Sequence, residues 1–287
     1  MTDFPPGFLP PGSSAVMVFT DKTPNTIILH RIVVRSFDLV RCTDLKPEET
    51  SDFLDLVIVI ARKMLSVWNH LQAYHAEEAR LGEKFWKDPD ATREHSQVLY
   101  DEFDVFSVQI KSALDHLVQV LRPVLGRKWT MYSFSDKGDG LLRSLQNNAS
   151  MKKYGGQIRM MEHHLFNDVN RTWLTALIDT RDRVNHGMTG GLKIQRFAVF
   201  RTSDRTVQLP MWNNVQSMAA MMDMAWGNLF RYVEDFIALS LNFRIKDEFS
   251  FIRLEAPLTS ADSTWKPTDR RSADAFVATH KPTTHIS

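Results

Sequence analysis

The chain has 287 residues, of which 43% are hydrophobic, so it is long enough to bury a substantial core in one large domain or two small ones. Its formal net charge of +1 excludes a global electrostatic field as the basis of nucleic-acid binding and leaves that role to a local patch. The single cysteine, Cys42, excludes an internal disulfide framework and a cysteine-based zinc site within one chain.

The N-terminal residues predict an extended arm that contains a β-hairpin. Residues 1–13 are rich in proline and glycine and lack the basic region of a signal peptide. Residues 14–20 and 26–41 are dense in β-branched and aromatic residues, and the segment DKTPN between them is typical of a turn. We therefore expect residues 1–46 to form the arm and hairpin. Because no run of about 18 apolar residues follows, we expect no transmembrane helix and a cytoplasmic protein.

Apolar residues recur every three or four positions in the next two segments, which predicts two long helices. The first covers about 48–82, with Gly82 as its stop residue. The second begins near Asp90, which is a favourable N-cap, and is closed by Pro123 and Gly126.

The connection over residues 126–154 is long for a compact domain, and it contains a predicted short helix at 140–147. Basic and aromatic side chains alternate along it, and such a mixture can bind single-stranded RNA through charge and stacking. The alternative is a solvated loop that its aromatic side chains pin to the core. The basic candidates for substrate binding are Arg127, Lys128, Lys152 and Lys153.

Two further helices are predicted at about 156–184 and 214–242, the second with Asn213 or Asn214 as its N-cap. Residues 192–200 and 205–209 predict a second β-hairpin, inserted before the last helix. One apolar stripe on each of the four long helices implies that they pack together as a bundle.

The C-terminal part predicts one strand at about 247–255 and then a disordered tail that begins at Ala256. The expected organisation is therefore an arm and hairpin over 1–46, a helical domain over 47–245, and a strand with a disordered tail over 246–287.

The segment IDTRDRVNHG at 178–187 carries the most specific chemical signal. It places four residues between Arg181 and His186, with Asp182 directly after the arginine. This pattern, near the end of the third long helix, resembles the signature of the HEPN superfamily, in which an arginine and a polar residue precede a histidine after a short gap. The segment SALDHLVQVLRPVLG at 112–126 also resembles the second helix of many members. The resemblance covers about residues 48–242 and implies a HEPN-like four-helix bundle.

The resemblance implies a metal-independent endoribonuclease that leaves 2′,3′-cyclic phosphate and 5′-hydroxyl ends. Arg181 would bind the scissile phosphate, because its planar guanidinium can bind phosphate oxygens in pairs. His186 would transfer a proton near neutral pH. Asp182 shares a helix face with His186 and would orient one of these two side chains. Asn185 and Arg183 would add contacts to the substrate.

The superfamily also implies a homodimer, RNA as the partner, a regulatory partner protein, and a role as a toxin or an anti-phage defence effector. Met188 departs from relatives that carry a tyrosine two residues after the histidine, which argues against the toxin half of that kind of pair. We expect no cofactor and no metal, since the adjacent Glu162, His163 and His164 point in different directions on a helix.

Two alternatives stay open at the motif. Arginine and histidine in the last turn of a helix, followed by a glycine, are also the residues that simple helix termination favours. A genuine motif is also compatible with a catalytically silent HEPN-like module that binds RNA, a nucleotide or a partner protein.

Overall fold

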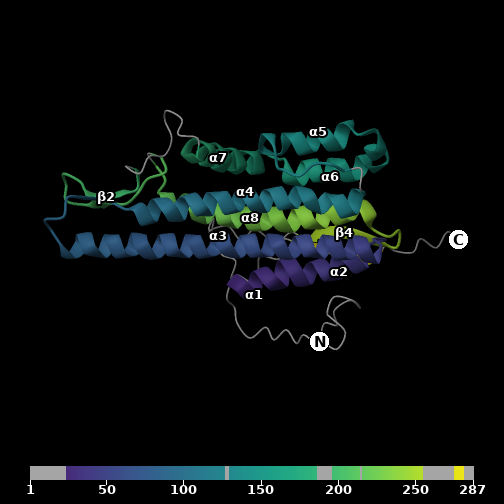
Figure 1. Cartoon of the computed structure of the whole chain (residues 1–287), viewed down its shortest axis with the longest axis horizontal. Helices are drawn as coiled ribbons and strands as arrows, with labels where there is room; N and C mark the ends of the chain where they lie inside the picture. The colour runs from purple at the N-terminus through teal and green to yellow at the C-terminus, as the bar shows by residue number, and fades with distance from the viewer. Residues whose placement is uncertain (1–23, 127–128, 186–195, 214, 255–274, 281–287) are drawn as a thin grey trace. The chain divides into compact units, whose positions relative to one another are not determined.

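The computed structural model describes residues 24–126, 129–185, 196–213, 215–254 and 275–280. These residues are mainly helical and carry a small antiparallel sheet, which confirms the predicted fold class at that level (Figure 1). They form two compact units. Unit 1 consists of Met1–Arg62, Ala113–Asn167 and Phe230–Ser287. Unit 2 consists of Lys63–Ser112 and Asp168–Leu229.

The N-terminal part of unit 1 is helical, so the strand predicted over 26–41 is wrong; residues 14–20 lie outside the described residues. The β-branched side chains that suggested a strand lie instead on the buried face of a helical stretch, with Ile28 and Ile32 four residues apart. Burial of this face outweighs the β-propensity of its residues. The stretch consists of α1 (Pro24–Ile28), η1 (Leu29–Val34) and α2 (Arg35–Arg41).

Helix α3 (Pro47–Lys87) extends beyond the predicted stop. Gly82 lies inside it, because Leu81 and Phe85 on either side are buried and their packing outweighs a glycine penalty of about 1 kcal/mol. The prediction that Gly82 ends the helix is therefore wrong.

Helix α4 (Gln97–Leu125) begins seven residues after the predicted Asp90. Its N-cap is Ser96, whose hydroxyl oxygen accepts a hydrogen bond from the Leu99 backbone N–H at 3.2 Å. Pro123 lies in the last turn, and Gly126 follows the helix with a φ of 91°, a left-handed conformation that glycine adopts without strain.

The single helix predicted over 156–184 is in fact two helices, α6 (Gly155–Leu165) and α7 (Asp168–Asn185). The break follows from Asn167, whose side-chain amide donates to the His164 carbonyl oxygen at 3.1 Å and so satisfies the end of α6. The short helix predicted at 140–147 is confirmed. The elements between α4 and α6 are η2 (Asp136–Gly138), α5 (Asp139–Asn147) and η3 (Ala149–Tyr154).

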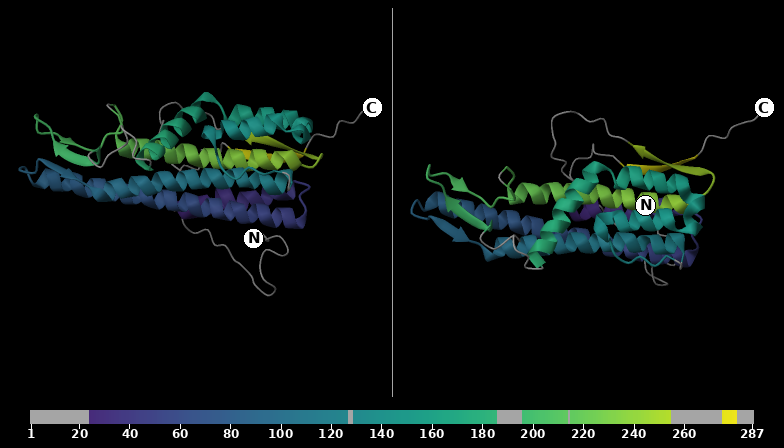
Figure 2. Two further views of the ribbon diagram at one scale, coloured as in Figure 1. Left: turned by 45° about the horizontal axis from the view of Figure 1, so that its top comes forward. Right: turned by 90° about the horizontal axis from the view of Figure 1, so that it is seen from above.

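Unit 2 contains a three-stranded antiparallel sheet, which Figure 2 shows beyond the C-terminal end of α3 and the N-terminal end of α4. The second predicted hairpin is confirmed in the strands β2 (Ala198–Arg201) and β3 (Val207–Gln208), whereas residues 192–195 of the predicted first strand lie outside the described residues. Strand β1 (Arg93–His95) pairs with the other edge of β2, with Arg93 opposite Phe200. The sequence prediction missed β1, since three polar residues show no strand pattern.

Helix α8 (Met218–Leu241) begins at a different cap from the predicted one. The Ser217 hydroxyl accepts from the Ala220 backbone N–H at 3.1 Å, so Ser217 caps the helix. Asn213 instead stabilises the preceding turn, with its Oδ1 accepting from the Gln216 N–H at 2.8 Å. Asn214 lies outside the described residues.

The C-terminal part of unit 1 contains η5 (Asn242–Arg244), β4 (Phe249–Leu254) and β5 (Ala275–His280). The predicted strand near 247–255 is confirmed as β4. The prediction of a disordered tail is wrong for residues 275–280, because β5 pairs with β4 in an antiparallel ladder from Phe249↔His280 to Leu254↔Ala275.

Each unit has its own apolar core. The core of unit 1 includes Val57, Leu117, Leu121, Leu145 and Phe236. The core of unit 2 includes Leu71, Phe103, Phe106, Leu174 and Trp226. Among the helices that the structure describes, none combines the length and the apolar character that a membrane crossing requires.

Candidate functional site

The predicted motif lies at the C-terminal end of α7, in unit 2. Buried Trp173, Leu174 and Leu177 anchor this helix to the core, and the buried Thr180 hydroxyl donates to the Ala176 carbonyl oxygen at 2.7 Å. Arg181 follows directly and is half-buried. The motif arginine is therefore held by a packed helix at its junction with solvent.

The remaining motif residues lie in the last turn of α7 and directly after it in the sequence. The backbone of Asp182, Arg183 and Asn185 is helical and completes α7. His186 lies outside the described residues, directly after the last residue of the helix. The structure thus describes the helix that would carry the motif, and the side chain of its first member.

Helix α4 brings an acidic side chain into the electrostatic range of the motif arginine. Burial raises the pKa of the Asp104 carboxyl above its ordinary value of 3.8, and the Arg181 guanidinium opposes that shift by favouring the charged form. Figure 1 shows α7 alongside α4. The prediction from sequence missed Asp104, because no spacing pattern links it to Arg181, 77 residues further along the chain.

The basic loop residues belong to unit 1, whereas the motif belongs to unit 2. Lys152 and Lys153 are exposed on η3, which belongs to unit 1, and the Lys153 ammonium lies 4.7 Å from the ring centroid of Tyr154. Arg127 and Lys128 lie outside the described residues. Trp129 and Phe134 are only 4% and 1% exposed, so these aromatic side chains pin the loop to the core instead of offering a stacking surface.

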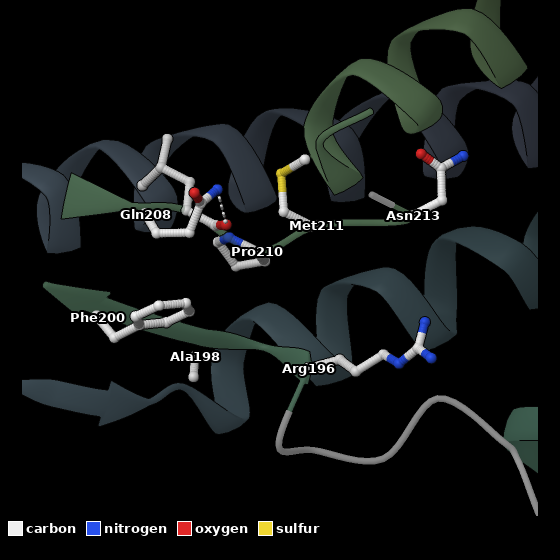
Figure 3. A pocket seen from close by; sticks show the side chains of 8 residues that line it. Arg196, Ala198, Phe200, Gln208, Pro210, Met211 and Asn213 are labelled. Atoms are coloured by element: carbon white, nitrogen blue, oxygen red, sulfur yellow. Dashed lines mark hydrogen bonds between the residues drawn. The ribbon is translucent and has the colours of Figure 1, made fainter. Parts of the chain in front are cut away.

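A cavity of about 400 Å³ opens in unit 2 beside the sheet, and no sequence pattern predicted it. Strands β2 and β3 pair at Phe200↔Gln208, and beyond that pair the two chain segments separate. Figure 3 shows Phe200 and Gln208 toward one end of the cavity and Arg196 and Asn213 toward the other. The lining residues are Arg196, Ala198, Phe200, Gln208, Leu209, Pro210, Met211 and Asn213.

A cluster of ionisable groups lies between α3 and α8 in unit 2, with Tyr74 and Glu78 buried, His75 half-buried and Asp223 exposed. His75 Nε2 and Asp223 Oδ1 are 2.9 Å apart, and this hydrogen bond raises the pKa of His75. Burial raises the pKa of both Glu78 and Tyr74. Within the described part of the chain, no three His, Cys, Asp or Glu side chains form a group that could hold a metal ion.

The chain matches no protein-family model, no curated protein and no solved structure. These comparisons therefore neither support nor oppose membership of the HEPN superfamily. The resemblance stays a prediction, carried by the motif and by a mainly helical fold.

Proposed function

We propose that the protein is a metal-independent endoribonuclease of the HEPN type, with its site at the C-terminal end of α7. The observation that carries this proposal is the position of Arg181 in the last turn of a packed helix, with His186 directly after the helix ends. The two residues are five positions apart in the chain.

The reaction needs a nucleophile, a charge stabiliser and proton transfer. The ribose 2′-hydroxyl attacks the adjacent phosphorus, and the bond from phosphorus to the 5′-oxygen breaks. The 2′-hydroxyl proton is lost to a base and the leaving 5′-oxygen gains a proton, so the products are a 2′,3′-cyclic phosphate and a 5′-hydroxyl. His186 transfers one of these protons, and Arg181 binds the charged phosphate oxygens.

Asp104 gives Arg181 an anionic neighbour from a second helix. The attraction of a nearby carboxylate favours some orientations of a guanidinium over others, so the side chain loses less freedom when phosphate binds. We assign Asp104 as a positioning residue for Arg181. In this proposal Asp182 orients Arg181 or His186. Asn185 and Arg183 contact the substrate.

The wider proposal covers assembly and biological role. One arginine and one histidine form a sparse site, so a homodimer that sets two motifs across one groove would complete it. An RNA-cleaving enzyme of this kind suits a toxin or an anti-phage defence effector restrained by a partner protein. In this proposal the helices adopt the HEPN-like four-helix arrangement.

Cleavage of total tRNA and of a single-stranded RNA in the presence of EDTA tests the proposal. We expect wild type to cleave, His186→Ala to lose at least about 100-fold in rate, the typical contribution of positioned proton transfer, and Arg181→Ala to lose a similar factor, the typical contribution of a charge stabiliser. The matched controls are Arg171→Ala on the same helix and His163→Ala at the exposed end of α6, and both should cleave like wild type.

The chemistry of the ends provides a second readout. A 5′-hydroxyl end accepts a labelled phosphate from polynucleotide kinase without prior dephosphorylation, whereas a 5′-phosphate does not. Absence of cleavage by folded wild type would favour the binding module over the enzyme. Equal cleavage by wild type and both motif variants would show that the activity comes from another site.

A further inference from the structure

The cavity beside β2 combines an aromatic face, a cation and two amides in one small volume. A volume of about 400 Å³ lies within the range of about 300–1,000 Å³ that is usual for small-molecule sites. Phe200, Gln208 and Met211 are half-buried in its wall, whereas Arg196 and Asn213 are exposed at its mouth. The apolar end and the polar end are therefore distinct, as Figure 3 shows.

The aromatic wall is held in place from both sides. Phe200 lies at the centre of the sheet, opposite Arg93 on β1 and Gln208 on β3. The Arg93 guanidinium lies 5.6 Å from the centroid of the Phe200 ring, within the range of a cation–π interaction. The ring is thus positioned before any ligand arrives, which lowers the entropy cost of stacking on it.

The polar groups have partly fixed orientations. The Asn213 Oδ1 accepts from the Val215 and Gln216 backbone N–H groups, at 2.9 and 2.8 Å, so the amide nitrogen lies on the opposite branch as a donor. Gln208 Nε2 donates to the Leu209 carbonyl oxygen at 3.3 Å. The Gln208 amide oxygen, an acceptor, therefore points away from that carbonyl. Arg196 donates one N–H to the Trp212 carbonyl oxygen at 3.4 Å, and a guanidinium carries five such donors.

We propose that this cavity binds one nucleotide of the RNA substrate, with the base stacked on Phe200 and the phosphate bound by Arg196. The inference rests on the proposed ribonuclease function and assigns a substrate subsite to it. Stacking on an aromatic ring combined with an arginine is the usual way in which proteins bind unpaired RNA bases. The cavity and the motif both belong to unit 2, and the cavity begins at Arg196, ten residues after His186.

The test uses the four nucleoside 5′-monophosphates AMP, CMP, GMP and UMP, titrated into the His186→Ala chain, which should leave an RNA oligonucleotide intact when it is added later as a competitor. Binding is followed by isothermal titration calorimetry and by ligand-observed NMR. We expect at least one monophosphate to bind. Phe200→Leu, which keeps an apolar side chain and removes the ring, should weaken that binding about tenfold.

A second arm separates the base from the phosphate. Arg196→Gln should weaken binding of the monophosphate about tenfold but leave binding of the matching nucleoside unchanged, whereas Phe200→Leu should weaken both. Arg205→Asn is the matched control, because Arg205 is an exposed cation of the β2–β3 turn that does not line the cavity. Asparagine also tolerates the positive φ of 66° at that position.

A third arm asks whether the ligand is part of RNA. A single-stranded oligonucleotide should compete with the bound monophosphate, and Phe200→Leu should lower kcat/KM for RNA cleavage. If no monophosphate binds, or if neither Phe200→Leu nor Arg196→Gln affects binding, the subsite is wrong while RNA cleavage by wild type still stands. If a monophosphate binds through Phe200 but the oligonucleotide does not compete, the site takes a free nucleotide and the assignment to RNA is overturned.

Discussion

Two buried glutamates, one in each unit, differ in their hydrogen-bond partners. Glu234 on α8 of unit 1 is 7% exposed and accepts two hydrogen bonds from the Arg31 guanidinium, at 2.6 and 2.5 Å. Glu78 on α3 of unit 2 is 8% exposed, and its Oε1 has no hydrogen-bond partner among the residues that the structure describes. The neighbouring Tyr74 hydroxyl likewise has none in the described ranges.

Whether a buried glutamate has a hydrogen-bond partner decides its effect on stability. In unit 1 the buried carboxylate fastens η1 to α8 through a two-point ion pair, and Arg31 also lies over the Phe230 ring at 4.9 Å. In unit 2 the buried polar atoms oppose folding, since an unpartnered buried group costs about 1–3 kcal/mol. Such groups are not confined to unit 2, because the buried Trp129 Nε1 of unit 1 also lacks a partner among the described residues.

Removing one partner of the ion pair gives the largest expected effect. Arg31→Ala should lower the free energy of unfolding by about 3 kcal/mol, because it removes the hydrogen-bonded counter-ion of the buried Glu234 and leaves only the weaker attraction of Arg35. Denaturant unfolding at pH 7 measures this loss. The control is Lys87→Ala, which breaks an exposed pair with Glu83 and should unfold like wild type. Equal stability of the two variants would mean that burial does not distinguish these pairs.

Glu234 also makes stability depend on pH. Burial raises its pKa from 4.5 to about 7, although Arg31 and Arg35 oppose the shift. Because the folded state holds the proton more tightly, this contribution to stability is complete below pH 4.5 and is lost as pH rises to about 7. Relative to Glu234→Gln, wild type should therefore lose on the order of 2 kcal/mol across that window. Parallel stability curves for the two chains would contradict the buried ionisation.

Removing an unpartnered buried group in unit 2 should increase the free energy of unfolding. Tyr74→Phe removes a buried hydroxyl that lacks a partner in the described structure and should stabilise the chain by about 1 kcal/mol, measured by thermal or denaturant unfolding. Tyr100→Phe, at a half-buried ring that packs edge-on against Phe197, serves as the control and should change stability little. A destabilised Tyr74→Phe variant would show that the hydroxyl is in fact satisfied.

The smallest effect on stability is expected at Asp104, where unit 2 sets an anion near Arg181. Asp104→Asn should change the free energy of unfolding by less than about 1 kcal/mol, because the carboxyl is half-buried and its burial penalty offsets the attraction. RNA cleavage should fall several-fold through a lower kcat, with Asp101→Asn as the exposed control. An unchanged kcat would remove Asp104 from the positioning role.

The sequence predicted the features that one apolar stripe determines. The courses of α3, α4 and α8 follow from residues three and four positions apart, and the β2–β3 hairpin follows from its alternation. The segment that tertiary burial decides was missed, since the β-branched residues around Ile32 form a helix. The break in the predicted third helix was also missed, although it depends on a local hydrogen bond from Asn167 to the His164 carbonyl oxygen. The cavity was beyond reach for a different reason, because its aromatic wall depends on Arg93 meeting Phe200 across 107 positions of the chain.

The pairing of β4 with β5 predicts what happens when the C-terminal segment is removed. The ladder joins six consecutive residue pairs across a 20-residue connection, so β5 covers a backbone edge that β4 would otherwise present to other molecules. A chain that ends at residue 255 would keep β4 and expose that edge. Exposed edges of this kind can template intermolecular strand addition, so we expect a chain shortened to residue 255 to self-associate more readily than the full chain at high concentration.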